Sequence, residues 1–140
     1  MSKLNNKGQS LVLFVVMLPL FIMMGVYLID VGYAKYNENK LNNVCTMVLN
    51  YGLDNIDNNP KDKMIKLIYE NENDIKEQNI LVDPNNKLIK ISVLKTSNGF
   101  LGNIIGKSIY KEKCAYTGYI KNDKKYIERD GIKWKKMLLK

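Results

Sequence analysis

A stretch of 19 residues without a charged side chain, from residue 11 to residue 29, most constrains what this chain can fold into. At about 1.5 Å of rise per residue, a helix of this length is roughly 28 Å long, close to the hydrocarbon thickness of a bilayer. A buried core helix is the alternative, but the rest of the chain is too polar to surround such a helix on all sides. The sequence therefore predicts a transmembrane helix over residues 9–30.

This apolar stretch is longer than the core of about 7–15 residues that is typical of a signal peptide. Residues 30–35, which follow it, contain no small-x-small cleavage site, so we expect the segment to remain as a single anchor. Lys3 and Lys7 lie near one end, and Lys35 and Lys40 lie near the other. The positive-inside rule therefore leans only slightly to a cytoplasmic N-terminus.

Two residues inside the apolar stretch have special backbone properties. Pro19 lacks a backbone N–H group and crowds the carbonyl of Val15, so we expect a kink or a looser turn there. Gly25 would allow another helix to approach closely, although glycine and proline are also common in membrane helices without such a role.

Beyond the apolar stretch, the chain has the pattern of an amphipathic helix. Apolar residues recur at spacings of three and four, with polar residues on the other faces. The apolar set is Val31, Ala34, Leu41, Val44, Cys45, Val48 and Leu49. Gly52 can adopt the left-handed conformation that ends a helix, with Leu53 packing back on Val48. We therefore expect one helix of about 40 residues, continuing over residues 31–53.

Residues 54–140 have the pattern of a small α+β region. Asn59 and Pro60 predict the start of a short second helix, with an apolar face formed by Met64, Ile65, Ile68 and Ile75. Alternation then predicts four strands, over residues 88–93, 107–121, 125–129 and 132–137, of which the last contains Trp134. We expect the apolar residues in the Gly-interrupted connection from residue 97 to 106 to form a plug over this sheet. Asn122-Asp123 and Asp130-Gly131 are two-residue hairpin signals. We expect a small antiparallel sheet that packs on the stripe from Leu41 to Leu49.

Composition argues against an enzyme. The chain has no histidine and two cysteines, so it cannot contain a histidine-based nucleophile or a four-cysteine zinc site. The acidic set Glu70, Glu72, Asp74 and Glu77 could hold a cation, but a solvated polar face is the simpler interpretation. We expect no catalytic residue, no metal and no cofactor. The net charge of +8 comes almost entirely from lysine.

Short motifs occur in a recognisable order along the first third of the chain. They are Gly8-Gln9-Ser10-Leu11-Val12-Leu13-Phe14, Leu18-Pro19-Leu20, Ile29-Asp30-Val31-Gly32-Tyr33 and Leu41-Asn42-Asn43. This order resembles the TadE/TadG-like proteins of tight-adherence (Flp) pilus systems. The positions that align with the family's motifs are Leu13, Phe14, Pro19, Asp30, Gly32, Leu41 and Asn43.

The resemblance implies a pilin-like α+β fold and the role of a pseudopilin. It implies a cytoplasmic leader over residues 1–8 and a cut by a prepilin peptidase between Gly8 and Gln9. Leu13 stands where the family has an acidic residue that can pair with a neighbouring subunit's amino terminus in lipid. An uncleaved anchor, or a subunit with a tip or priming role, therefore fits better than a bulk filament subunit.

The two cysteines have two possible interpretations. Cys45 lies on the apolar stripe, and Cys114 lies on a predicted strand outside the membrane. A helix-to-sheet disulfide between them would stabilise the fold by roughly 3–5 kcal/mol on the entropic account. The alternative is that both are small buried apolar side chains.

Two functions from different classes follow. The first is a structural component of pilus assembly, anchored in the bacterial cytoplasmic membrane with residues 54–140 outside. Its partners would be the lipid bilayer, other pilins or pseudopilins, the assembly membrane proteins and the prepilin peptidase. The alternative is an anchored binding module, in which lysines near the C-terminus contact anionic wall polymer or lipid. These lysines are Lys121, Lys124, Lys125, Lys133, Lys135 and Lys136. Nucleic acid is not expected as a partner, because the membrane would place this basic region outside the cell.

Overall fold

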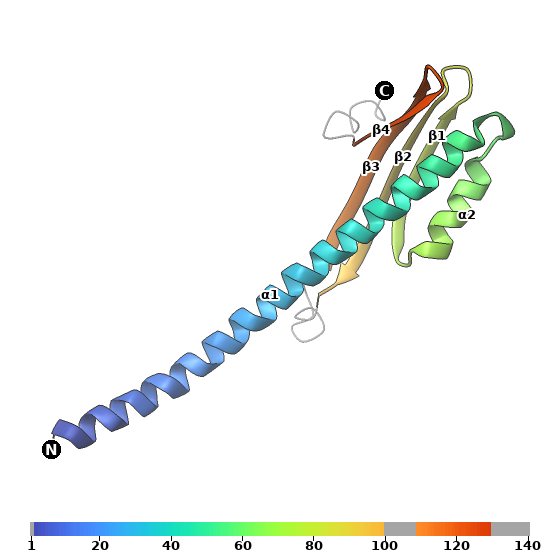
Figure 1. The fold of residues 1–140 in the computed structure, drawn as a ribbon. Helices are drawn as coiled ribbons and strands as arrows, with labels where there is room; N and C mark the ends of the chain where they lie inside the picture. The colour runs from blue at the N-terminus through green and yellow to red at the C-terminus, as the bar shows by residue number, and fades with distance from the viewer. Residues whose placement is uncertain (1, 100–108, 130–140) are drawn as a thin grey trace, which may run out of the picture.

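The structure, a computed structural model, describes residues 2–99 and 109–129 (Figure 1). Within them it has a long N-terminal helix, a short second helix and a four-stranded antiparallel sheet, which confirms the predicted α+β fold. The elements are α1 (Ser2–Asp54), the 3₁₀ turn η1 (Ile56–Asn58), α2 (Lys61–Asn71), β1 (Ile75–Asp83), β2 (Leu88–Asn98), β3 (Ile109–Lys121) and β4 (Lys124–Arg129). Neighbours in sequence pair in the order β1-β2-β3-β4.

Helix α1 has two halves with different surroundings. At about 1.5 Å per residue it is roughly 80 Å long, and it continues through Pro19 without interruption. Its N-terminal half extends away from the rest of the molecule, whereas its C-terminal half lies across the sheet (Figure 1). The large apolar side chains of residues 11–24 are all exposed. Among the described residues, no other element covers the large apolar side chains of this stretch of α1.

The core lies between the C-terminal half of α1 and the inner face of the sheet. The predicted stripe supplies Leu41, Val44, Cys45, Val48 and Leu49, all of which are buried. Opposite them lie the inner residues of the central strand β2, which are Ile89, Ile91 and Val93. Met64 and Ile68 of α2 close one side of this core. The sheet thus covers the stripe as the periodicity predicted.

Helix α1 does not end at Gly52, and that prediction was wrong. The helix includes Gly52 and ends at Asp54. A β-carbon added at Gly52 would lie 2.5 Å from the sulfur of Met64 and 3.0 Å from Ile89 Cδ1. Glycine stands here because α2 and β2 approach the helix closely, rather than because the backbone must turn. Leu53 is buried against β3 at Gly118.

The start of α2 and the strand after it also differ from the prediction. Asn59 does not cap the helix; it adopts a left-handed backbone with φ 49°, and Pro60 occupies the cap position. Ile75 was predicted to lie on the face of this helix, but it begins β1, a strand that the alternation did not predict. β2 continues past its predicted end at residue 93 as far as Asn98.

The turn between β3 and β4 confirms the hairpin prediction. Asn122 and Asp123 have φ values of 52° and 60°, as a tight two-residue turn requires. Other expectations concern residues outside the described ranges: most of the Gly-interrupted connection from residue 97 to 106, the Asp130-Gly131 turn, and the strand over 132–137 with Trp134.

Candidate functional site

The core changes from apolar to charged toward the end of the sheet from which the N-terminal half of α1 extends. On β2, the inner row passes from Val93 to Lys95, and on β3 it passes from Cys114 to Glu112. The strand register places Lys95 directly opposite Glu112. Their residues are only 7% and 4% exposed, so two ionisable side chains lie inside the helix–sheet interface.

Glu72 is the third buried ionisable residue, and it lies just after α2. It is 2% exposed, and the ammonium of Lys95 donates to its Oε2 at 2.5 Å. Lys40 of α1 lies 3.8 Å from the other carboxylate oxygen. The expectation that Glu72 belongs to a solvated face was therefore wrong. Its carboxylate joins α1, α2 and β2 through charge, which is costly to bury unless it is paired in this way.

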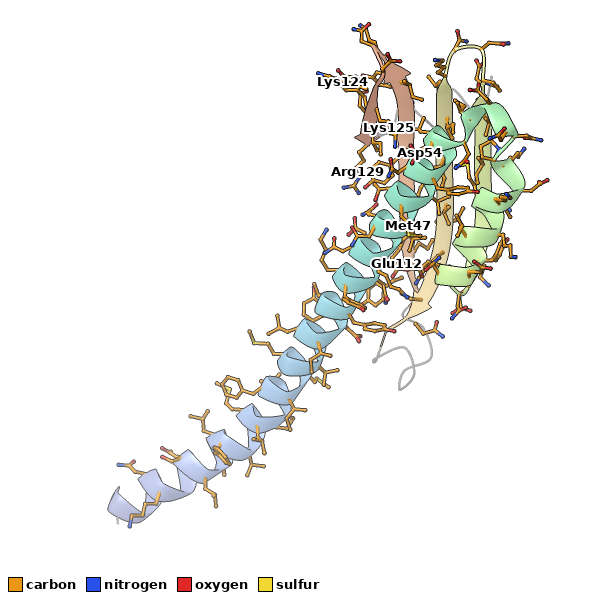
Figure 2. The ribbon with its side chains drawn as sticks, turned by 45° about the vertical axis from the view of Figure 1, so that its right-hand side comes forward. Met47, Asp54, Glu112, Lys124, Lys125 and Arg129 are labelled. Carbon is orange, nitrogen blue, oxygen red and sulfur yellow. A yellow bond between two sulfur atoms is a disulfide. The ribbon has the colours of Figure 1, made fainter. Side chains whose placement is uncertain are left out.

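Glu112 has no such cation. The hydroxyl of Ser97 donates to Glu112 Oε1, whereas Oε2 is buried and has no hydrogen-bond partner among the described residues. Lys95 is ion-paired with Glu72, and no ion pair to Glu112 occurs in the described part of the chain. Figure 2 places Glu112 near the end of the sheet where α1 leaves it. An unpaired buried carboxylate is expensive, so a donor or a cation placed here would satisfy the group that the described residues leave without one.

Beside Glu112 is a cavity of about 240 Å³ between α1 and β3, which we call the neck cavity. The α1 wall consists of two small apolar and two charged side chains: Val31, Ala34, Lys35 and Glu38. The β3 wall consists of Tyr110, Lys111 and Glu112. The cavity therefore combines an apolar side with charges of both signs.

Glu38 is already paired at the edge of this cavity. Lys35 Nζ lies 2.9 Å from one of its oxygens, and a guanidinium nitrogen of Arg129 on β4 lies 3.3 Å from the other. The hydrogen bond from Lys35 is the main reason that the pKa of Glu38 lies below its usual value, and Arg129 adds to the effect. Lys125 of β4 pairs with Asp54 in the same way (Figure 2). These two pairs attach the edge strand to α1.

Asp30 lies next to the neck cavity, at the end of the apolar stretch. It is fully buried, and it is not without a partner. A β-carbon added at Gly99 would lie 3.0 Å from Asp30 Oδ2 and 2.6 Å from a ring carbon of Tyr110. Any larger residue at position 99 would therefore require the side chain of Tyr110 or Asp30 to move.

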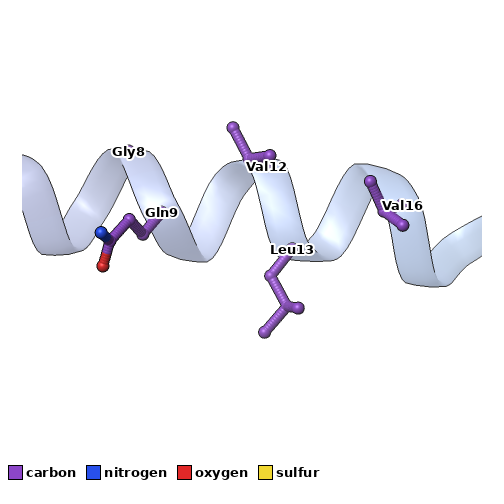
Figure 3. A pocket seen from close by; sticks show the side chains of 5 residues that line it. All are labelled: Gly8, Gln9, Val12, Leu13 and Val16. Carbon is purple, nitrogen blue, oxygen red and sulfur yellow. The ribbon is translucent and has the colours of Figure 1, made fainter.

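Gly8 and Gln9, the residues of the predicted cleavage site, lie in helical backbone near the start of α1. They are exposed, and with Val12, Leu13 and Val16 they line a shallow apolar hollow along one side of the helix (Figure 3). No atom of another element comes within 4 Å of a β-carbon added at Gly8. Packing within the chain therefore does not explain the glycine.

The remaining motif positions fall into two groups. Phe14, Pro19, Gly32 and Asn43 are exposed on α1, whereas Leu41 is fully buried in the core. The exposed set has no packing role in the described fold.

Of the two interpretations of the cysteines, the structure has the disulfide. It joins Cys45 of α1 to Cys114 of β3, with 6.6 Å between the two Cα atoms, and both residues are fully buried. The bond links α1 to β3 at Cys114, which is two residues from Glu112 on the same strand.

Among the described residues, no group of three or more cysteine and acidic side chains has an arrangement that could hold a metal ion. One described helix, α1, is long and apolar enough to cross a membrane. Comparison of the chain with protein-family models, with curated proteins and with solved structures finds no match.

Proposed function

We propose that this protein is a membrane-anchored, pseudopilin-like component of a tight-adherence pilus or a related secretion system. Its role is structural: the N-terminal half of α1 crosses the cytoplasmic membrane once, with its N-terminus inside. The sheet region then lies outside, on the same continuous helix.

The observation that supports this proposal is the division of α1 into two halves. One helix exposes its large apolar side chains over residues 11–24 and buries an apolar stripe from Leu41 to Leu49 under a sheet. Exposing so many large apolar side chains to water would be unfavourable, and a bilayer removes this cost. The continuous helix would also transmit the position of the anchor to the sheet region without a flexible joint.

The exposed start of α1 is consistent with processing. Gly8 and Gln9 do not pack against the described core, so removal of residues 1–8 would leave that core intact. The leucine at position 13 favours a priming or tip subunit, because a filament subunit of this type would need a carboxylate there.

Topology and processing can be tested on the full chain. Single cysteines introduced as Ser2→Cys and Lys124→Cys report the two ends, since the native cysteines are joined to each other. On intact cells that lack a prepilin peptidase, so that residue 2 is retained, a membrane-impermeant maleimide should label Lys124→Cys and not Ser2→Cys. With a prepilin peptidase co-expressed, mass spectrometry should find a chain that begins at Gln9.

Gly8→Leu should prevent this processing, and Gly32→Leu is the matched control. Both glycines lie on α1 with free space around them, but Gly32 is far from the cut. Equal processing of both variants would contradict cleavage at Gly8. Labelling of Ser2→Cys from outside would contradict the orientation. Deletion of the gene in its host should abolish surface pili, and normal pili would contradict the role in assembly.

The alternative, an anchored module with a basic surface, has less to support it. Lys125 is ion-paired with Asp54, which leaves the exposed Lys121 and Lys124 as the other described lysines of this set. Lys133, Lys135 and Lys136 lie outside the described residues. Retention of pili after deletion, together with binding to anionic wall polymer, would favour this alternative.

A further inference from the structure

The neck cavity contains a charge that the described chain does not balance. Glu112 lines it, is 4% exposed, and has a buried oxygen without a hydrogen-bond partner among the described residues. This oxygen is itself buried, so a ligand donor in the cavity reaches it only when the carboxylate rotates toward the cavity, and rotation about the last side-chain bond of a glutamate is soft. A ligand ammonium would supply both the missing donor and the missing positive charge.

The rim of the cavity carries two lysines, one of them beside the paired carboxylate of Glu38. Lys111 is exposed and has no ion pair within the described ranges, and Lys35 keeps most of its side chain exposed beside its bond to Glu38. Two lysines at the rim suit a phosphate group. The cavity therefore matches a ligand with a primary ammonium at one end and a phosphate at the other.

The position of the cavity indicates where such a ligand comes from. Val31 is two residues beyond the apolar stretch, which puts this wall about 3 Å past the hydrocarbon boundary if the stretch spans the bilayer. Lipid headgroups occupy roughly the next 5–7 Å. Below Val31, the same side of α1 continues as Tyr27, Met24 and Leu20, which are all exposed. Acyl chains can lie along that side while the headgroup fills the cavity.

We propose that the neck cavity binds the headgroup of an aminophospholipid of the phosphatidylethanolamine type. Its ammonium donates to Glu112, and its phosphate contacts Lys35 and Lys111. A choline headgroup has the same charges, but its methylated nitrogen has no N–H group to donate. A glycerol headgroup lacks the positive charge. The site therefore selects a primary amine, and this selection rests on the proposed membrane anchoring.

Native mass spectrometry of the full chain can test this selection. The protein is released from mixed vesicles of phosphatidylethanolamine, phosphatidylcholine and phosphatidylglycerol, and the retained lipid is identified. Wild type should retain the ethanolamine lipid over the choline lipid by roughly ten-fold, the scale of one charge-assisted hydrogen bond. Glu112→Gln should lose this preference, because an amide carries no charge. Glu77→Gln, an exposed glutamate on β1, is the matched control and should keep it.

A second variant acts without changing any charge. Ala34→Leu places a larger side chain on the cavity wall and should also abolish the preference, and intact disulfide and helical circular dichroism would show that it folds. Equal retention of the three lipids by wild type would overturn the proposal, and so would an unchanged preference in Ala34→Leu. Competition by soluble phosphoethanolamine without retention of the lipid would reassign the cavity to a free metabolite.

Flotation separates failure of this proposal from failure of the anchor. If the protein floats with pure phosphatidylcholine vesicles but shows no lipid preference, the proposed membrane anchor is supported and the proposed headgroup site is contradicted. A protein that floats with no vesicles contradicts the anchor itself.

Discussion

Glu72 shows how a single residue can differ from what its neighbourhood in sequence suggests. It stands in an acidic, polar segment, and nothing within ten residues of it marks it as buried. Its partner Lys95 is 23 residues away on another element, and the pair becomes favourable only when both are enclosed. Local pattern cannot reveal such a residue, because its burial depends on a long-range contact.

Lys95→Met should destabilise the protein by about 3 kcal/mol, since it leaves the buried Glu72 with only the distant Lys40. The double variant Glu72→Leu with Lys95→Met should recover most of this loss. Urea unfolding of the full chain in detergent, monitored by circular dichroism, gives the free energy of unfolding of the single and the double variant. Lys66→Met, which breaks an exposed ion pair on α2, should change stability by less than about 0.5 kcal/mol. A similar loss in the single and double variants would contradict the buried pair.

Glu38, which lines the neck cavity, predicts that the stability of the fold depends on pH. Its pKa in the folded protein lies below the usual 4.5, chiefly because of the hydrogen bond from Lys35. The stabilisation is therefore present above the unfolded value and is lost as the pH falls through the folded pKa. Lys35→Met should raise the pKa of Glu38 in a ¹³C NMR titration, whereas Lys66→Met should not. An unchanged pKa in Lys35→Met would assign the effect to Arg129.

At the scale of elements, β1 is the strand that alternation did not predict. Its inner positions are Gln78, Ile80 and Val82, so one of three is polar, and a register shift between Ile75 and Glu77 breaks the pattern further. Edge strands need only one well-paired neighbour, and β2 provides it. The tertiary pairing, rather than the local sequence, makes this segment a strand.

Gly118 lies where side chains of α1 pack closely on the sheet. A β-carbon there would lie 2.9 Å from Leu53 Cδ1 and 3.0 Å from Leu49 Cγ. Gly118→Val should destabilise the fold by about 1–3 kcal/mol through overpacking, although valine favours strands. Thermal unfolding measures the loss. The control Lys113→Val, at an exposed position of the same strand, should be nearly neutral. An equal effect of the two variants would mean that the helix can move away from β3.

At the scale of the whole molecule, one helix joins an apolar rod to a compact region. Among the described residues, the C-terminal half of α1 contacts the compact region through the apolar stripe, the disulfide and several ion pairs, which include those of Glu38 and Asp54. The sheet region therefore cannot tilt relative to the rod without breaking its own core. This coupling is what an assembly subunit needs if its anchor sets the position of its outer part.

The disulfide should contribute strongly to this coupling. It closes a separation of 69 residues, so Cys45→Ala with Cys114→Ala should lower stability by about 4 kcal/mol on the entropic account. Thermal unfolding with and without reductant measures this contribution. Reductant should destabilise wild type and leave the double variant unchanged. Labelling of free thiols in unreduced wild type would contradict the bond.

The sequence by itself determined the features that arise from residues close together in the chain. The apolar stretch, the stripe from Leu41 to Leu49 and the turn at Asn122-Asp123 each follow from periodicity or local backbone preference. Only the tertiary structure decided that Gly52 lies inside the helix and that Glu112 lies in a cavity beside the apolar rod. Burial and close approach depend on partners far away in sequence, and no local pattern encodes the energy of those contacts.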